Sequence, residues 1–291
     1  FLLDTETPNE PSEFNIKFFV GDKRYWYALV LDDKQVIKED LYVYNSVQPS
    51  LVFSRELDGT ASLIKLNASL VKANTTIVEQ LNVKCLSNMS FFAARNQVNC
   101  SLAYIDEVRD WMKNNMMPII EPGTRMFEYA GKQMEKNAEL KAYILDFVHK
   151  ADYNITDVYT EREKVPIPDF VKTSIMEDKD IPEKTKEKML ADNALERLRT
   201  DFQHTVKNKR GEENYRLPNS LQSEGTKRTF GIEAAIYEAI KTNGILPIDE
   251  IESSLHPELV EFIIEKFLKE KSRSQLIVTS HYDPLLNTVD D

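Results

Sequence analysis

Residues 245–281 read ILPIDEIESSLHPELVEFIIEKFLKEKSRSQLIVTSH, and this stretch decides the fold. It begins with an apolar strand, residues 245–250, that ends in two adjacent acids. It closes with a second apolar strand, residues 275–281, that ends in small hydroxyls and a histidine, and residues 257–271 between them have apolar side chains at helical spacing. A strand–helix–strand crossover places parallel strands side by side, so both carboxyl ends should meet at one edge of a sheet. We therefore predict an α/β fold.

Three side chains at that edge have the chemistry needed to hydrolyse a nucleotide. Asp249 could hold a magnesium ion through its water shell, and Glu250 could polarise a water that attacks the γ-phosphate. A neutral His281 could donate one hydrogen bond to a phosphate oxygen and accept another from that water. Taken alone, an acidic pair after a strand is more often a solvated turn, and a lone histidine is more often structural. Their occurrence one helix apart favours a shared site.

A third feature is the tetrapeptide Ser223-Glu224-Gly225-Thr226, which precedes a helix expected over residues 227–241. A serine and a glycine at a helix N-terminus present a hydroxyl and backbone N–H groups to an anion, which the helix dipole also favours. An ordinary N-cap is the alternative explanation, because serine and threonine cap helices routinely.

Together these stretches resemble the ABC ATPase family. Residues 222–226, QSEGT, stand where that family has its signature LSGGQ, and residues 249–256, DEIESSLH, stand where it has the Walker B acids and the D-loop, DEPTSALD. The resemblance implies a RecA-like ATPase head that binds ATP and Mg²⁺ at a head-to-tail dimer interface. It implies Glu250 and His281 as catalytic residues and Asp249 as the metal ligand. The nucleotide-binding residues that it implies are Ser223, Glu224, Gly225, Thr226, Ser253 and Ser254.

The residues at the variable positions of these motifs are similar to those of one branch of that family. Residues 223–227, SEGTK, and residues 249–257, DEIESSLHP, look like the prokaryotic ABC/OLD-like ATPases of phage defence, or abortive infection, a group that includes the ATPase subunit of the PARIS system. This resemblance implies a homodimer or higher homo-oligomer, a partner effector such as a Toprim-type nuclease, and a phage trigger protein. No nuclease motif is visible in the sequence itself, so the effector is expected on another chain or segment.

The sequence departs from the ABC pattern in two places. No Gly-x-x-x-x-Gly-Lys-[Ser/Thr] loop occurs, so the α- and β-phosphates have no cradle within these residues. Since the sequence starts at Phe1, we expect a preceding segment of a longer protein to supply the phosphate (Walker A) loop and the Q-loop; a degenerate, non-hydrolysing relative is the alternative. Pro247 removes one backbone N–H from a strand that should be central, which predicts a local bulge.

The rest of the chain divides into further expected parts. Residues 1–66 alternate apolar and polar side chains between turn signals, which predicts an antiparallel β-meander belonging to the ATPase core. Residues 67–150 have helical periodicity and are expected to form a helical subdomain. Residues 151–216 are charged and are expected to be an inserted helical or coiled arm, with one helix running from Ile181 through Arg199. Residues 217–291 are expected to form the lobe that contains the signature motif, the Walker B acids, the D-loop and His281, the switch histidine of the ABC pattern.

Composition limits the class of protein. With 42% apolar and 29% charged residues over 291 positions, the chain is typical of a globular protein, and no apolar run approaches the ~20 residues of a membrane span. A net charge of −11 argues against a generally DNA-coating surface but leaves a local nucleic-acid site open. Cys85 and Cys100 are expected to be free thiols in a reducing cytoplasm.

Three functions remain compatible with the sequence. The leading one is an ATPase whose cycle senses a trigger and controls an effector. The second is an ATP-binding scaffold with negligible turnover that sequesters an effector, and steady-state phosphate release would separate the two. The third is an SMC-like ATPase of DNA repair or DNA-end binding, which stimulation of turnover by duplex ends would favour.

Overall fold

The computed structural model describes residues 10–151, 154–191 and 194–289, so the start at Phe1 lies outside the described residues. The chain forms two compact units, Phe1–Asn114 and Asn115–Asp291, called the N-terminal and C-terminal units below. The division falls inside the 67–150 segment that we expected to be one helical subdomain. Residues up to Asn114 belong with the antiparallel sheet, and those from Asn115 pack with the C-terminal lobe, because each set buries its apolar side chains in a different core.

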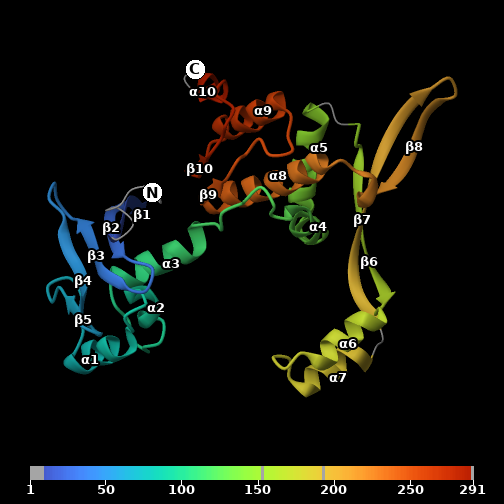
Figure 1. Ribbon diagram of the computed structural model, residues 1–291. Helices are drawn as coiled ribbons and strands as arrows, with labels where there is room; N and C mark the ends of the chain where they lie inside the picture. Colours follow the sequence, from blue (N-terminus) through green and yellow to red (C-terminus); the bar gives the residue numbers. More distant parts are fainter. Residues whose placement is uncertain (1–9, 152–153, 192–193, 290–291) are drawn as a thin grey trace. The chain divides into compact units, whose positions relative to one another are not determined.

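The N-terminal unit contains a five-stranded antiparallel sheet whose strands are neighbours in sequence order, which confirms the predicted meander (Figure 1). Gly21, at φ 58°, and Gly59, at φ 62°, make two of its turns in the left-handed backbone conformation that glycine adopts without strain. The strands are β1 (Ser12–Val20), β2 (Lys23–Leu31), β3 (Val36–Tyr44), β4 (Ser50–Asp58) and β5 (Ala61–Leu66).

Three helices complete the N-terminal unit: α1 (Thr75–Lys84), α2 (Phe91–Arg95) and α3 (Ile105–Asn115). Their apolar side chains share one core with the strands. At its centre Phe53 of β4 stacks on Phe91 of α2, with ring centroids 3.9 Å apart, and Phe18 of β1 stacks on Trp111 of α3 at 4.5 Å. The helical periodicity over this part of the chain is therefore confirmed.

Two fully buried charged residues also connect the sheet to the helices. Glu39 of β3 and Arg55 of β4 are cross-strand partners and both are 0% exposed. The Glu39 carboxylate accepts hydrogen bonds from the Tyr27 hydroxyl at 2.9 Å and from the Phe91 backbone N–H at 2.6 Å. Burial raises the pKa of Glu39 to about 7 despite these hydrogen bonds. Arg55 donates to the Ser62 hydroxyl at 2.9 Å and to backbone carbonyls, so its charge is well hydrogen-bonded.

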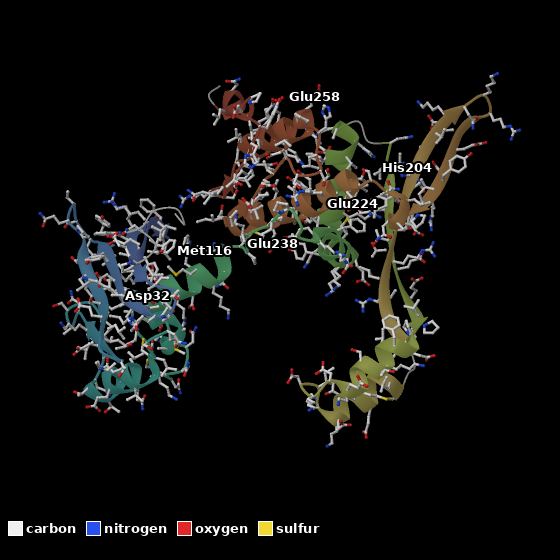
Figure 2. The ribbon with its side chains drawn as sticks, in the orientation of Figure 1. Asp32, Met116, His204, Glu224, Glu238 and Glu258 are labelled. Carbon is white, nitrogen blue, oxygen red and sulfur yellow. The ribbon has the colours of Figure 1, made fainter. Side chains whose placement is uncertain are left out.

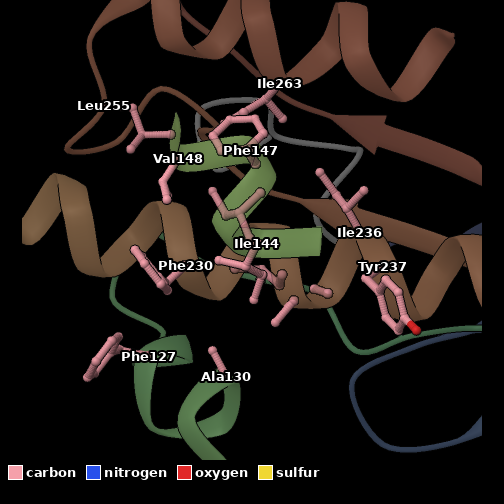
Figure 3. Packing of buried hydrophobic residues seen from close by; sticks show 14 of the residues in the cluster. Phe127, Ala130, Ile144, Phe147, Val148, Phe230, Ile236, Tyr237, Leu255 and Ile263 are labelled. Atoms are coloured by element: carbon pink, nitrogen blue, oxygen red, sulfur yellow. The ribbon is translucent and has the colours of Figure 1, made fainter. Parts of the chain in front are cut away.

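The C-terminal unit is packed around one long helix, α8 (Glu224–Thr242) (Figure 1). Phe230 and Ile236 of α8 meet Phe127, Phe147 and Ile263 from three other helices in a single core (Figure 3). The other elements are α4 (Met126–Lys136), α5 (Ala138–Lys150), β6 (Asp157–Pro166), α6 (Asp169–Glu177), α7 (Glu183–Ala191), β7 (Ala194–Asn208), β8 (Gly211–Pro218), η2 (Asn219–Leu221), β9 (Ile245–Ile248), α9 (Pro257–Leu268), β10 (Gln275–Val278) and α10 (Leu285–Val289).

The segment 151–216 differs from the helical or coiled arm that we expected. Its described residues form a three-stranded antiparallel sheet in the order β6-β7-β8, with α6 and α7 between β6 and β7. The helix expected from Ile181 through Arg199 ends at Ala191, and β7 starts at Ala194. Thr200 and Phe202 are buried while Arg199 is exposed, a period of two that matches a strand. His204, further along β7, is labelled in Figure 2.

Gly231 allows α4 and α8 to approach closely. A Cβ added at Gly231 would overlap the Met126 side chain and lie 3.1 Å from the Met126 backbone carbonyl carbon. We expect Gly231→Ala to lower the free energy of unfolding by about 1–3 kcal/mol, because overpacking outweighs the helix propensity that alanine adds. Urea unfolding of the purified protein measures this change.

The matched control is Gly123→Ala, because no atom lies within 4 Å of a Cβ at Gly123 and its backbone is not left-handed. Its free energy of unfolding should stay within about 0.5 kcal/mol of the wild-type value. A Gly231→Ala protein that is as stable as the wild type, or more stable, would show that α4 and α8 are not packed this tightly.

Two observations concern the expected compartment. Cys85 is buried and Cys100 is partly buried, and neither forms a disulfide. Among the described residues, no helix is both long enough and apolar enough to span a membrane. The cytoplasmic location stays a prediction from the sequence.

Candidate functional site

The candidate site lies at one edge of a parallel sheet in the C-terminal unit. β9 and β10 pair in parallel with Ile245 opposite Gln275 and Ile248 opposite Val278, as the strand–helix–strand pattern predicts. On the other side of β9, Met116 and Ile120 form parallel bridges with Ile245 and Ile248. Three parallel segments therefore end at the same edge of the sheet. The residues that directly follow them are the candidates for binding and catalysis.

Pro247 fits this sheet without the bulge that we expected, because the register of β9 with β10 runs unbroken past it. Its carbonyl accepts a hydrogen bond from the Ile120 N–H at 3.0 Å, so the missing N–H of Pro247 faces residues 116–120. That segment forms isolated bridges with β9 rather than a continuous ladder. The next hydrogen bond between them runs from the Asp249 backbone N–H to the Ile120 carbonyl at 2.9 Å. A proline is tolerated here because pairing on this side is already intermittent.

Thr279 holds the two predicted acids at the end of β9. Its hydroxyl donates to Asp249 Oδ1 at 2.5 Å and accepts from the Glu250 backbone N–H at 2.8 Å. One Asp249 oxygen is therefore fixed by a neighbouring strand. From the sequence, residues 279–280 were recognisable only as small hydroxyl side chains after a strand. The contacts of Thr279 with Asp249 and Glu250 follow from the pairing of β9 with β10.

Glu250 and His281 are brought together at this edge. Glu250 Oε1 lies 3.7 Å from His281 Nε2, and the two side chains are 46% and 85% exposed, so both are open to a ligand. The His281 backbone N–H donates to Glu252 Oε1 at 2.6 Å. Burial raises the pKa of Glu252, but this N–H and the other hydrogen bonds to its carboxylate outweigh that effect and lower the pKa overall. Glu252 therefore fixes the backbone of His281 as an ionised acceptor.

Two residues of the turn after β9 have a left-handed backbone. Glu250 has φ 45° and Ser254 has φ 63°, although neither is glycine. Such a conformation costs about 1–3 kcal/mol and persists only where the surroundings hold it. The Glu250 carbonyl accepts from the Ser253 N–H at 2.9 Å, which closes the turn and places the predicted nucleotide-binding residues Ser253 and Ser254 next to the acids.

The tetrapeptide 223–226 starts α8, three residues earlier than the sequence predicted. Ser223 is the N-cap: its hydroxyl accepts from the Thr226 N–H at 3.0 Å and lies 2.8 Å from the Thr226 hydroxyl. Glu224 is exposed at this end of α8 (Figure 2) and pairs with Lys227 at 2.7 Å. The ordinary capping role is therefore present, and the helix N-terminus still favours an anion in front of it.

The start of α8 touches the turn after β9 in the same chain. A Cβ added at Gly225 would lie 2.6 Å from the Ser254 backbone carbonyl oxygen, so only glycine fits at this contact. A pocket of about 430 Å³ opens beside it, lined by residues 122–128, by Glu224, Lys227 and Arg228 of α8, and by Ser254. The structure thus brings residues 223–226 and Ser254 into one group, adjacent to the group of Asp249, Glu250 and His281.

Arg228 lies between the two groups and was not singled out by the sequence. It is only 9% exposed, and burial lowers the pKa of its guanidinium, while the carboxylates of Glu250 and Glu252 oppose that effect. No sequence pattern around Arg228 pointed to it, because its partners lie more than twenty residues away along the chain.

In the part of the chain that the structure describes, no three His, Cys, Asp or Glu side chains are grouped to hold a metal ion by themselves. Magnesium usually binds one or two carboxylates together with phosphate oxygens and waters. Asp249 fits that mode, since Thr279 holds Oδ1 and orients the carboxylate at the strand end.

Two solved structures are similar to the chain. The SMC head domain from Thermotoga maritima is 12% identical, with 91% of this chain and 67% of that chain covered and a TM-score of 0.34. An SMC head bound to the C-terminal winged-helix domain of ScpA is 10% identical, with 89% and 72% covered and a TM-score of 0.36. No curated protein matches the sequence.

A family match covers most of the C-terminal unit. Residues 128–287, more than half of the chain, match the family described as "AAA domain, putative AbiEii toxin, Type IV TA system". The matched region contains Ser223, Asp249, Glu250 and His281, and so the whole edge of β9 and β10 described above. The chain belongs to this family of AAA domains.

Proposed function

We propose that the chain is part of an ABC-type ATPase that hydrolyses ATP with Mg²⁺ at a head-to-tail dimer interface and controls a partner effector in anti-phage defence. The observation that carries this proposal is the meeting of Asp249, Glu250 and His281 at one edge of a parallel sheet, inside the region that matches the AAA-domain family. The motif resemblance to phage-defence ATPases and the toxin–antitoxin description of the family support the role in defence.

Each residue at the edge has a role in this proposal. Glu250 orients the attacking water and accepts its proton, and His281 donates a hydrogen bond to the γ-phosphate. Asp249 holds Mg²⁺, which when bound neutralises charge on the phosphate oxygens. The 3.7 Å separation of Glu250 Oε1 and His281 Nε2 supports these roles, because one water can hydrogen-bond to both side chains at once.

The proposal also assigns roles to groups beyond this edge of the sheet. ATP binding in this proposal also needs a phosphate-binding loop to cradle the α- and β-phosphates, and the 291 residues contain no Gly-x-x-x-x-Gly-Lys-[Ser/Thr] motif. A second protomer offers the α8 N-terminus, with Ser223 and Gly225, to the γ-phosphate. The effector contact is assigned to the β6-β7-β8 sheet with α6 and α7, where Phe170 and Met176 are 76% and 61% exposed.

The test is steady-state phosphate release by the protein together with its phosphate loop, with and without EDTA. Mg²⁺-dependent phosphate release is expected. Tight ATP binding without phosphate release would favour the second function, an ATP-binding scaffold that sequesters an effector, over an ATPase. A large stimulation of phosphate release by duplex DNA ends would favour the DNA-end-binding ATPase over effector control.

A further inference from the structure

Arg228 contacts the ends of two neighbouring strand segments. One of its terminal nitrogens, Nη1, donates to the carbonyls of Glu121 at 3.3 Å and Pro122 at 3.1 Å, directly after the segment that bridges to β9. The other, Nη2, donates to the Glu250 carbonyl at 3.3 Å, directly after β9. A planar guanidinium with donors in a fixed fork suits this task, since it can hold carbonyls from two segments at a set separation.

The Glu250 peptide unit is consequently held on both sides. Its N–H donates to the Thr279 hydroxyl, and its carbonyl accepts from Arg228 and from the Ser253 N–H. Glu250 is one of the few described non-glycine residues with a left-handed backbone, at φ 45°. Because φ sets the direction of the Cα–Cβ bond, the contacts that maintain this conformation also aim the carboxylate at the side where His281 lies.

Arg228 sits in the first two turns of α8, whose N-terminal residues 223–226 are the candidate phosphate contacts. The start of α8 is held by two further contacts: Ser223 caps the helix, and Gly225 touches Ser254. Arg228 therefore connects the start of α8 directly to the Glu250 carbonyl.

We propose that Arg228 is a positioning residue that orients the Glu250 carboxylate and links its orientation to the N-terminus of α8. This inference rests on the proposed function, in which Glu250 acts on the attacking water. Arg228 does not touch the reacting atoms, so its effect on hydrolysis should pass entirely through Glu250.

The test is a double-mutant cycle on phosphate release. Arg228→Met should lower kcat on the order of 10–100-fold and change KM for ATP by less than about threefold. The reason is that the Glu250 carboxylate loses its orientation while the residues that bind the nucleotide are unchanged. In a Glu250→Gln background the same change should cost less than about twofold. Arg228→Lys, which keeps the charge but loses the fork, should fall between, and it is measured in the same cycle if Arg228→Met does not fold.

Lys241→Met is the matched control, since Lys241 is an exposed cation at the far end of α8 that pairs with Glu139. It should leave kcat and KM within about twofold of the wild type. Equal fold-losses from the Arg228 change in both backgrounds would overturn the inference while leaving the ATPase intact. Absence of phosphate release by the wild type would instead overturn the proposed function.

A nucleotide-free measurement decides the inference in that second case. Hydrogen–deuterium exchange should be about tenfold faster at the Glu250 and Ser253 amides in Arg228→Met, and unchanged in Lys241→Met, because these amides depend on the held turn. Unchanged exchange in Arg228→Met would show that Arg228 does not hold Glu250, and would overturn the inference.

Discussion

Glu250→Gln is expected to lower phosphate release on the order of 10²–10⁴-fold while ATP binding is kept. Glutamine has the same shape, so the backbone contacts of Glu250 with Thr279 and Arg228 stay, and Asp249 still binds the metal. What is lost is the carboxylate that accepts the proton of the attacking water. Phosphate release and equilibrium binding of labelled ATP are measured on the same protein preparation.

The control for this substitution is Glu258→Gln on α9. Glu258 is a surface acid with an 88% exposed side chain, labelled in Figure 2, and it should show wild-type turnover. Turnover near the wild-type rate in Glu250→Gln would remove the assignment of Glu250 as the residue that activates water. Loss of ATP binding together with turnover would instead assign Glu250 to ligand binding.

Mixing two inactive proteins, Ser223→Arg and Glu250→Gln, is expected to restore activity. In a head-to-tail dimer one site of each mixed dimer combines an intact Glu250 with the partner's intact Ser223. Random equal mixing should give about a quarter of the wild-type phosphate release, because about half of the dimers are mixed and each has one intact site. The separate mutants should be nearly inactive, since an arginine in front of α8 fills the space of the phosphate.

Capping and ligand binding by Ser223 can be separated with Ser223→Asp. Aspartate caps helices as well as serine does, so the free energy of unfolding should change by less than about 0.5 kcal/mol. Its negative charge would nevertheless repel a phosphate, so turnover should fall as in Ser223→Arg. Full activity in Ser223→Asp, or no activity above the separate mutants in the mixture, would rule out the head-to-tail arrangement.

The parts of the fold that the sequence predicted depend on neighbours along the chain. The β-meander follows from consecutive alternating strands separated by Gly21 and Gly59, which adopt the turn conformation. The proximity of Asp249, Glu250 and His281 follows from a single crossover, which allows one arrangement of the two strands. Their chemical roles remain predictions.

The features that the sequence missed depend on contacts between distant segments. The charged stretch before Arg199 looks helical locally, yet residues 194–203 of β7 pair with β6, whose residues lie 28 to 46 positions earlier in the chain. The positions of Thr279, Glu252 and Arg228 matter because of which backbone groups they reach, and those groups belong to other elements. Local periodicity contains no information about such partners.

The parallel segments of the C-terminal unit are contributed by residues 116–120, 245–248 and 275–278, so nearly half of the chain separates the first from the second. On the ribosome, the consecutive hairpins of the N-terminal unit can pair as they emerge. Residues 116–120 must wait for β9, and at typical translation speeds that delay is roughly ten seconds. Meanwhile the apolar faces of α4 and α5 have no α8 to cover them. We therefore expect the nascent chain, more than the folded protein, to need chaperones that prevent aggregation of these exposed apolar faces.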